Sequence, residues 1–148
     1  MNTLQSLLHE SLIATGHVES CTLFKKDRTI KASSIGYEPS PEQMDSLVEA
    51  FHNPISAREH GIQFNGASYK CVRADKDSIY AKKEGSGFIA VKTNSMVIFG
   101  TYSSSMYPSV CVEAVEKLDS DIEEIVDIRN RKSRKLVVTN IKASSLFS

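Results

Sequence analysis

The chain has 148 residues, of which 41% are hydrophobic and 24% are charged. These values are ordinary for a single globular domain, and a chain of this length buries roughly two-thirds of its unfolded surface. The formal net charge is zero, so attraction to an acidic partner must come from local clusters of basic residues. No apolar run approaches the ~20 residues of a membrane span, and the N-terminus lacks the basic segment of a secretory signal.

The first quarter of the chain predicts a helix followed by a β-hairpin. Gly16 is placed to end the helix. Residues 18–24 are predicted as a strand, residues 25–28 as a polar turn and residues 30–34 as the returning strand. The buried side of the helix is predicted from leucines at helical spacing, which are Leu4, Leu7, Leu8 and Leu12.

A second helix is predicted from Pro41, with Ser40 as its N-cap and proline at the favoured first position. Pro54 should end this helix, and residues 55–60 should form a short helical turn. One face of the second helix is predicted to carry Met44, Leu47, Val48 and Phe51.

The segment from Tyr69 to Tyr102 predicts four consecutive antiparallel strands with turns near residues 75–77, 85–87 and 93–94. A short strand at 62–64 and a tight Asn65-Gly66 turn lead into this meander. The Gly85-Ser86-Gly87 sequence joins two strands, so we interpret it as a hairpin turn and not as a phosphate-binding loop. The meander is expected to present a basic face that carries Arg73, Lys82, Lys83 and Lys92.

The last predicted helix begins at Pro108 and buries a stripe formed by Val112, Val115, Leu118 and Ile122. The predicted fold class is therefore α+β, an antiparallel meander with the N- and C-terminal helices covering one face of the sheet. After Ile128 the composition becomes basic, so we predict a domain over 1–128 and a flexible tail over 129–148. The basic residues of this tail are Arg129, Arg131, Lys132, Arg134 and Lys135.

The sequence offers no constellation typical of catalysis or metal binding. The cysteines Cys21, Cys71 and Cys111 are widely spaced and form no Cys-x-x-Cys pair. No serine, cysteine or carboxylate has an identifiable base partner. We therefore expect a protein of the reducing cytoplasm that is not an enzyme and needs no cofactor or metal, with the cysteines as small packed side chains.

Several segments, taken in order, resemble the profilin family of actin-monomer-binding proteins. They are LQSLL, HVESCTL, GIQFNGASYKCVRAD, SIYAKK, GFIAVKT, VIFGTY and MYPSVCVEAVEKL, which together span about residues 1–126. Within them, RADKDSIYAK and MYPSVCVEA are most similar to the divergent fourth vertebrate type of profilin. The resemblance implies a profilin-like fold, a cytoskeletal location and three ligand classes: actin monomers, proline-rich segments and acidic phosphoinositides.

For actin, the resemblance points to the later strands and the outer side of the last helix. Arg73, Lys82 and Lys92 match basic positions, and Tyr80 replaces what is often an arginine. On the helix, the matching positions are occupied by Val112, Glu113, Glu116 and Lys117. Glu113 stands where many profilins carry a lysine, and reversing a central interface charge can cost about 2–5 kcal/mol. We therefore expect weak binding of actin monomers.

For proline-rich ligands, the resemblance implies a cleft of aromatic side chains between the two terminal helices. The chain has no tryptophan. The matching positions hold Leu4, Leu7, Asp121 and Ile122, which cannot provide a flat aromatic wall. Proline-rich ligands are therefore expected to bind poorly.

For acidic phospholipids, the expected contacts are Lys82, Lys83 and the basic residues 129, 131, 132, 134 and 135. At ~1 kcal/mol per basic residue, the five tail charges would provide at most about 5 kcal/mol, which is sub-millimolar binding. The same charges could instead be solvated or complement the dipole of the preceding acidic helix. Two other functions remain open: a membrane-recruited adaptor that no longer regulates actin, and a longin- or roadblock-like trafficking scaffold. If the chain functions as a profilin, we expect it to be a monomer.

Overall fold

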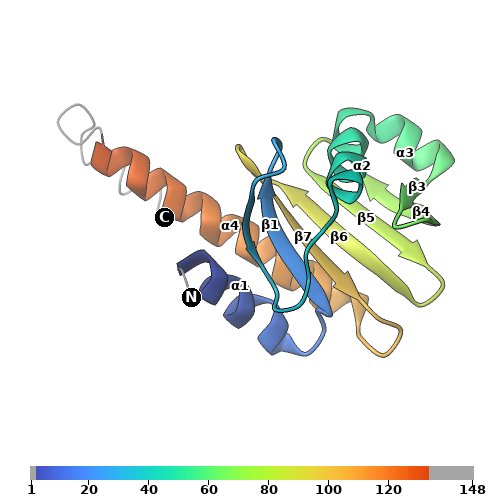
Figure 1. The fold of residues 1–148 in the computed structure, drawn as a ribbon, viewed down its shortest axis with the longest axis horizontal. Coiled ribbons are helices and arrows are strands. Elements are labelled where there is room, and N and C mark those ends of the chain that lie inside the picture. Colours follow the sequence, from blue (N-terminus) through green and yellow to red (C-terminus); the bar gives the residue numbers. More distant parts are fainter. Residues whose placement is uncertain (1–2, 134–148) are drawn as a thin grey trace.

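The computed structural model describes the backbone of residues 3–133 and the side chains of residues 3–122. One seven-stranded antiparallel sheet, ordered β2-β1-β7-β6-β5-β4-β3, lies between two helical layers (Figure 1). The helices are α1 (Thr3–Ser11), the 3-10 helix η1 (Ile13–Thr15), α2 (Pro41–His52), α3 (Pro54–His60) and α4 (Pro108–Ser133). The strands are β1 (Ser20–Lys25), β2 (Ile30–Ser33), β3 (Ile62–Phe64), β4 (Ala67–Ala74), β5 (Ser78–Lys83), β6 (Ser86–Lys92) and β7 (Met96–Tyr102). The predicted α+β class, the hairpin and the four-stranded meander are confirmed.

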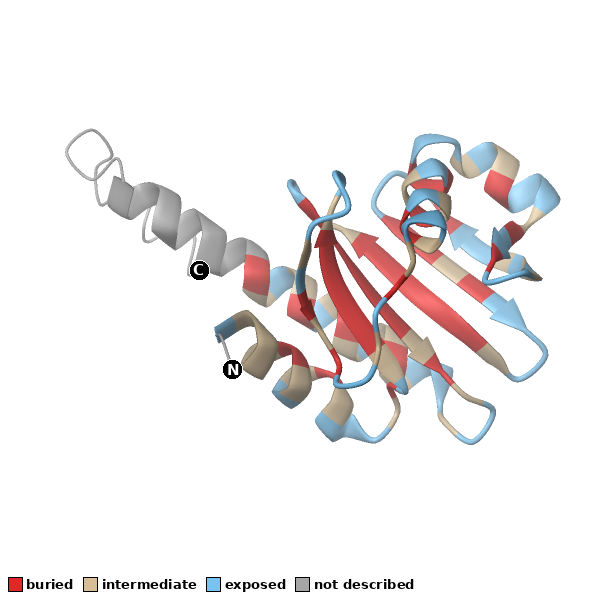
Figure 2. Cartoon of the chain, viewed as in Figure 1, coloured by how far each residue is buried: buried red, intermediate tan, exposed pale blue. Residues whose placement is uncertain are grey.

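The terminal helices α1 and α4 cover one face of the sheet, as predicted. They pack through aliphatic side chains against the central strands, which are the most buried part of the chain (Figure 2). The contributing residues are Leu8 of α1, Leu12 between α1 and η1, and Cys111, Val115, Leu118 and Ile122 of α4. Cys111 takes the place that the sequence assigned to Val112, which lies half-buried on the flank of α4.

The helices α2 and α3 cover the opposite face, where the core is aromatic. Figure 1 shows both helices on the side of the sheet away from α4. The Ser40 hydroxyl accepts the Gln43 backbone N–H at 3.2 Å, and the Gln43 side chain accepts the Ser40 N–H at 2.9 Å. This capping box confirms the predicted start of α2.

The turn between β5 and β6 lies one residue earlier than predicted. Glu84, with φ 58°, and Gly85 form the turn, while Gly87 is a paired strand residue opposite Lys82 and Tyr102. A Cβ atom on Gly87 would collide with the ring of Tyr102 and the carbonyl of Ala81. The glycine is therefore needed for close packing inside the sheet and not for the turn.

The last helix extends beyond the predicted domain boundary at residue 128. α4 continues to Ser133, so residues 129–133 are helical in backbone. The side chains of Arg129, Arg131 and Lys132, and all of residues 134–148 with Arg134 and Lys135, lie outside the described part of the chain. The flexible tail and its lipid contacts stay predictions.

Candidate partner-binding surface

The flank of α4 meets β4 and β5 in a polar cluster. The Tyr80 hydroxyl donates a hydrogen bond of 2.7 Å to Glu116 Oε1, which ties β5 to α4. The guanidinium of Arg73 lies 5.3 Å from the centroid of the Tyr80 ring, within cation–π range. Arg73 also forms an ion pair with Asp75 at 3.2 Å. The sequence analysis placed Arg73, Tyr80 and Glu116 on one expected actin surface, and the structure brings these three side chains together.

The electrostatics of this cluster favour a neutral tyrosine. Burial, followed by the hydrogen bond and charge of Glu116, raises the pKa of Tyr80 to about 12. The Asp75 carboxylate raises the pKa of Arg73 above its usual value. At neutral pH the cluster therefore contains the Arg73 cation and the neutral Tyr80 phenol. Arg73 is paired with Asp75, and the Tyr80 hydroxyl is bonded to Glu116.

A β-bulge determines which residues share this surface. The pairing of β4 with β5 shifts between Cys71 and Arg73, so Val72 has no partner and is 60% exposed. The bulge returns Arg73 to the same face as Lys70. Lys70 lies opposite Lys82, and both side chains are exposed. Lys70 was not among the predicted residues, because only the register of β4 on β5 places it beside Lys82.

The expectation that the meander has one basic face is wrong. Lys92 is paired with Val97, which packs in the aromatic core beneath α2, so Lys92 lies on the opposite face from Arg73. Lys83 follows Lys82 directly, and consecutive strand residues point to opposite faces. The α4 face therefore keeps Arg73 and Lys82, while Lys83 and Lys92 lie on the α2 face.

The four candidates on α4 also divide between two sides of the helix. Val112 and Glu116 are one helical turn apart on the flank facing β5, where Glu116 meets Tyr80. Glu113 and Lys117 line a groove of about 400 Å³ between α4 and the end of α1. The other lining residues are Glu10, Ser11, Thr15, Val110, Ala114 and Asp121, and none of the eight is aromatic.

The start of α4 adds an exposed aromatic ring that the sequence analysis did not select. Tyr107 is 67% exposed and stacks on His17 with ring centroids 5.1 Å apart. Its backbone N–H donates to His17 Nδ1 at 3.0 Å. The available signal was the position of Tyr107 directly before Pro108, where the predicted helix begins, because proline disfavours the helical conformation in the residue that precedes it.

Two of the three cysteines, Cys21 and Cys111, are buried and packed. Burial raises the pKa values of Cys21 and Cys111 to about 12, which keeps both as unreactive thiols. Cys71 is only half-buried, against the expectation of a fully packed residue. Within residues 3–122, no group of three or more histidine, cysteine or acidic side chains could hold a metal ion. None of the described helices has the length and apolar character needed to cross a membrane.

Comparison with known proteins gives a consistent result. The Profilin family profile matches residues 2–125. Profilin-4 of Bos taurus is 47% identical over 120 residues, covering 80% of this chain and 93% of the bovine protein. Profilin-4 of Mus musculus is 45% identical over the same length, with the same coverage.

Solved structures agree with the sequence matches. Profilin IA of Acanthamoeba castellanii superimposes with a TM-score of 0.73 at 32% identity, covering 81% of this chain and 96% of that protein. Profilin of Schizosaccharomyces pombe gives a TM-score of 0.74 at 26% identity, covering 82% and 97%. Because the family profile matches residues 2–125, which is most of the chain, and two relatives at 47% and 45% identity cover 80% of it, this chain belongs to the profilin family.

Proposed function

We propose that this protein is a cytoplasmic, cytoskeletal profilin that binds an actin monomer weakly and stoichiometrically, without catalysis. The binding surface is formed by the β5-facing flank of α4 together with β4 and β5. A protein of the same fold, LokiProfilin1, has been solved in complex with rabbit actin, so the fold can bind actin. Family membership in place of a longin or roadblock fold removes the trafficking-scaffold alternative.

The weakness of binding is inferred from one observation, the internal pairing of the polar cluster. Glu116 is occupied by Tyr80, and Arg73 is occupied by Asp75. A partner that needs these groups must replace contacts that already exist, so the gain on binding is small. Glu113 adds an exposed negative charge on the neighbouring side of α4.

Assembly of pyrene-labelled actin with excess protein tests this proposal. Wild type should sequester monomers only at high concentration. Glu113→Lys should bind more tightly by a few-fold, because Glu113 is exposed beside the proposed surface and a charge at the rim of an interface acts mainly through long-range attraction. Glu59→Lys is the matched control, because Glu59 is an exposed acid on α3, on the face of the sheet opposite to α4. Equal effects of the two reversals, or tight binding by wild type, would refute the proposal.

The proposed lipid contact uses Lys82, Lys83 and the basic residues of 129–135. Lys82 and Lys83 are the last two residues of β5, directly before the β5–β6 turn, and point to opposite faces of the sheet. A flat bilayer can therefore touch both only edge-on at that turn. Co-sedimentation with phosphatidylserine vesicles at low salt should fall when the five basic residues at 129–135 are replaced by glutamine. Glutamine preserves helix propensity while removing charge. Unchanged pelleting would rule out the tail.

We further propose that proline-rich ligands bind poorly. At the positions expected to line the proline cleft, Leu4 and Leu7 are partly buried against the core, Ile122 is buried and Asp121 is acidic, so none offers an aromatic ring on which proline could stack. Titration calorimetry with decaproline should show no saturation below millimolar concentration. A micromolar dissociation constant would contradict this inference.

The second candidate is a membrane-recruited adaptor that no longer regulates actin. Glu113 and the basic residues after residue 128 favour it. It predicts vesicle binding with no effect on actin assembly by wild type or by Glu113→Lys. A gain of monomer binding in Glu113→Lys would instead favour the weak actin-binding profilin.

A further inference from the structure

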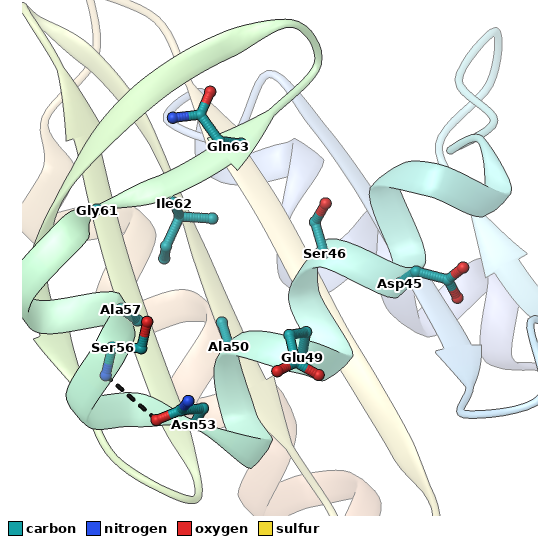
Figure 3. Close-up of a pocket in the computed structure, with 10 residues that line it drawn as sticks. All are labelled: Asp45, Ser46, Glu49, Ala50, Asn53, Ser56, Ala57, Gly61, Ile62 and Gln63. Atoms are coloured by element: carbon teal, nitrogen blue, oxygen red, sulfur yellow. Dashed lines mark hydrogen bonds between the residues drawn. The ribbon is translucent and has the colours of Figure 1, made fainter.

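A second concave surface lies on the α2/α3 side of the sheet, away from the α4 surface. The cleft between α2, α3 and β3 has a volume of about 370 Å³ (Figure 3). Its apolar part is formed by Ala50, Ala57 and Ile62. The two alanines are small and the Ile62 side chain is buried, so none of the three fills the cleft. Its polar rim is formed by Asp45, Ser46, Glu49, Asn53, Ser56 and Gln63.

One wall of this cleft is the outer edge of the sheet. β3 is the terminal strand and pairs only with β4. Asn65 and Gly66 have φ values of 53° and 74°, which is the geometry of a two-residue type I′ hairpin. In such a hairpin the flanking residues Phe64 and Ala67 bond to each other.

Hydrogen-bonding direction alternates along an antiparallel strand, so the next residue, Gln63, directs its backbone N–H and C=O away from β4. Outside the strand ladders, no backbone hydrogen bond of the described residues involves Gln63. Gln63 therefore offers one donor and one acceptor at the mouth of the cleft, in the geometry that a further strand would use.

The opposite edge of the sheet, formed by β2, is covered by a side chain. On β2, the Ser33 backbone N–H donates to Gln5 Oε1 at 3.1 Å, and Gln5 Nε2 donates to the Ser33 carbonyl. The side-chain amide of Gln5 thus occupies the place of a neighbouring strand and blunts that edge. On β4, Arg58 of α3 donates to the Ala74 carbonyl. The described chain provides no comparable cover for Gln63.

The charge of the cleft indicates the kind of partner. None of its ten lining residues is basic, and two are acidic. Asp45 is already paired with Arg28 from the β1–β2 turn. Glu49 is exposed and has no ion pair with a described residue, so a cation in the cleft would meet a free carboxylate.

We propose that this cleft binds an extended segment of a partner protein by strand addition to β3. Two backbone hydrogen bonds to Gln63 set the register, and the two ligand residues on either side of that point direct their side chains into the cleft. One is a small apolar residue against Ala50, Ala57 and Ile62. The other, two positions away, is a lysine or arginine that pairs with Glu49. Because the cleft and the α4 surface lie on opposite faces of the sheet, both can be occupied at once.

The probe for this proposal is a fluorescein-labelled peptide of sequence GSTVTKTSG, followed by fluorescence anisotropy with the full chain. Gln63→Pro should weaken binding about tenfold or more, because it removes the outward N–H while leaving the β4 ladder intact. Glu49→Lys should weaken binding by about fivefold or more. Glu59→Lys, the same charge change on α3 outside the cleft, should bind like wild type.

Two further measurements separate strand addition from a structural effect of the variants. A peptide N-methylated at the amides that face Gln63 should fail to bind wild type, with no change made to the protein. On binding of the unmodified peptide, the Gln63 amide proton should become protected from hydrogen exchange. Absence of binding at millimolar peptide, equal binding of the N-methylated peptide, or full affinity in Gln63→Pro would overturn the proposal. A wild-type dimer that Gln63→Pro dissociates would also overturn it, since a second copy would then be the occupant.

Discussion

The two faces of the sheet are packed with different kinds of side chain. Beneath α1 and α4 the core is mainly leucine, isoleucine and valine. Beneath α2 and α3 it is aromatic and contains every phenylalanine of the described residues, which are Phe24, Phe51, Phe64, Phe88 and Phe99. The chain thus uses its large rings to build the interior of the α2/α3 layer. The positions on the terminal helices where the profilin resemblance expects aromatic residues are occupied instead by Leu4, Leu7, Asp121 and Ile122.

The aromatic face should be the less tolerant of truncation, and Phe99→Ala tests it with the largest expected effect. The Phe99 ring lies 5.2 Å from Phe64 and 5.4 Å from Phe88 between centroids, and its side chain is fully buried. We expect its removal to lower the free energy of unfolding by about 3–5 kcal/mol. Urea unfolding measures the change, and a loss below about 1 kcal/mol would show that the cluster is not a tightly packed core.

Substitution of Gly61 and of Gly36 by alanine tests how closely β3 packs on β4 at the edge of the aromatic face. Gly61 has φ 77°, and an added Cβ would lie 2.6 Å from the Tyr69 carbonyl oxygen. Gly36 has φ 81° with nothing within 4 Å. Gly36→Ala should cost about 1 kcal/mol from its backbone conformation. Gly61→Ala should cost about 1–3 kcal/mol more, from the collision and from a backbone conformation, with ψ −173°, that essentially only glycine adopts. Equal thermal unfolding of the two variants would contradict close packing of β3 on β4.

On the aliphatic face, Tyr80→Phe removes the hydrogen bond between β5 and α4. We expect a loss of about 1 kcal/mol in unfolding free energy, because water can reach this half-buried site. The folded pKa of Tyr80 is about 12, above its ordinary value of 10, so the fold favours the neutral phenol. Its contribution is complete below pH 10 and is lost as the pH rises through 12.

The difference in stability between wild type and Tyr80→Phe should therefore be constant up to about pH 10 and shrink above it. Glu116→Gln is the companion variant, since burial is the main cause of the raised pKa of Tyr80 and the interaction with the Glu116 charge adds to it. Tyrosine absorbance at alkaline pH should then show Tyr80 ionising earlier. A pH-independent difference would show that the bond to Glu116 does not stabilise the fold.

The smallest effect is expected at the protected sheet edge. Gln5→Ala removes the amide that bonds both backbone groups of Ser33, at a cost of about 0.5–1.5 kcal/mol. Hydrogen exchange of the Ser33 amide should become faster by about tenfold. Unchanged exchange would show that the edge of β2 does not depend on Gln5, and would weaken the contrast with β3.

Local signals in the sequence were sufficient for the elements themselves. Ser40 before Pro41 located the start of α2, Asn65-Gly66 located the β3–β4 turn, and the leucine spacing identified the buried side of α1. Each of these depends on a few neighbouring residues, so no tertiary information was needed.

The candidate surface depended on information that the sequence does not carry locally. A bulge at Val72 decides the face of Arg73, and the face of Lys92 follows from its pairing with Val97. One residue of register moves a side chain to the other face of a sheet. The bond between Tyr80 and Glu116 joins positions 36 residues apart, and only the packing of α4 on the sheet brings them together.

Amide chemical-shift mapping of the labelled protein during titration with unlabelled actin monomers tests the proposed surface most directly. We predict that broadening and shifts concentrate on Arg73, Tyr80 and Glu116, with saturation only at high actin concentration. Residues of α2 and α3 should be unaffected. Perturbations centred on α2 and α3, or saturation at low actin concentration, would contradict a weak actin site on the α4 face.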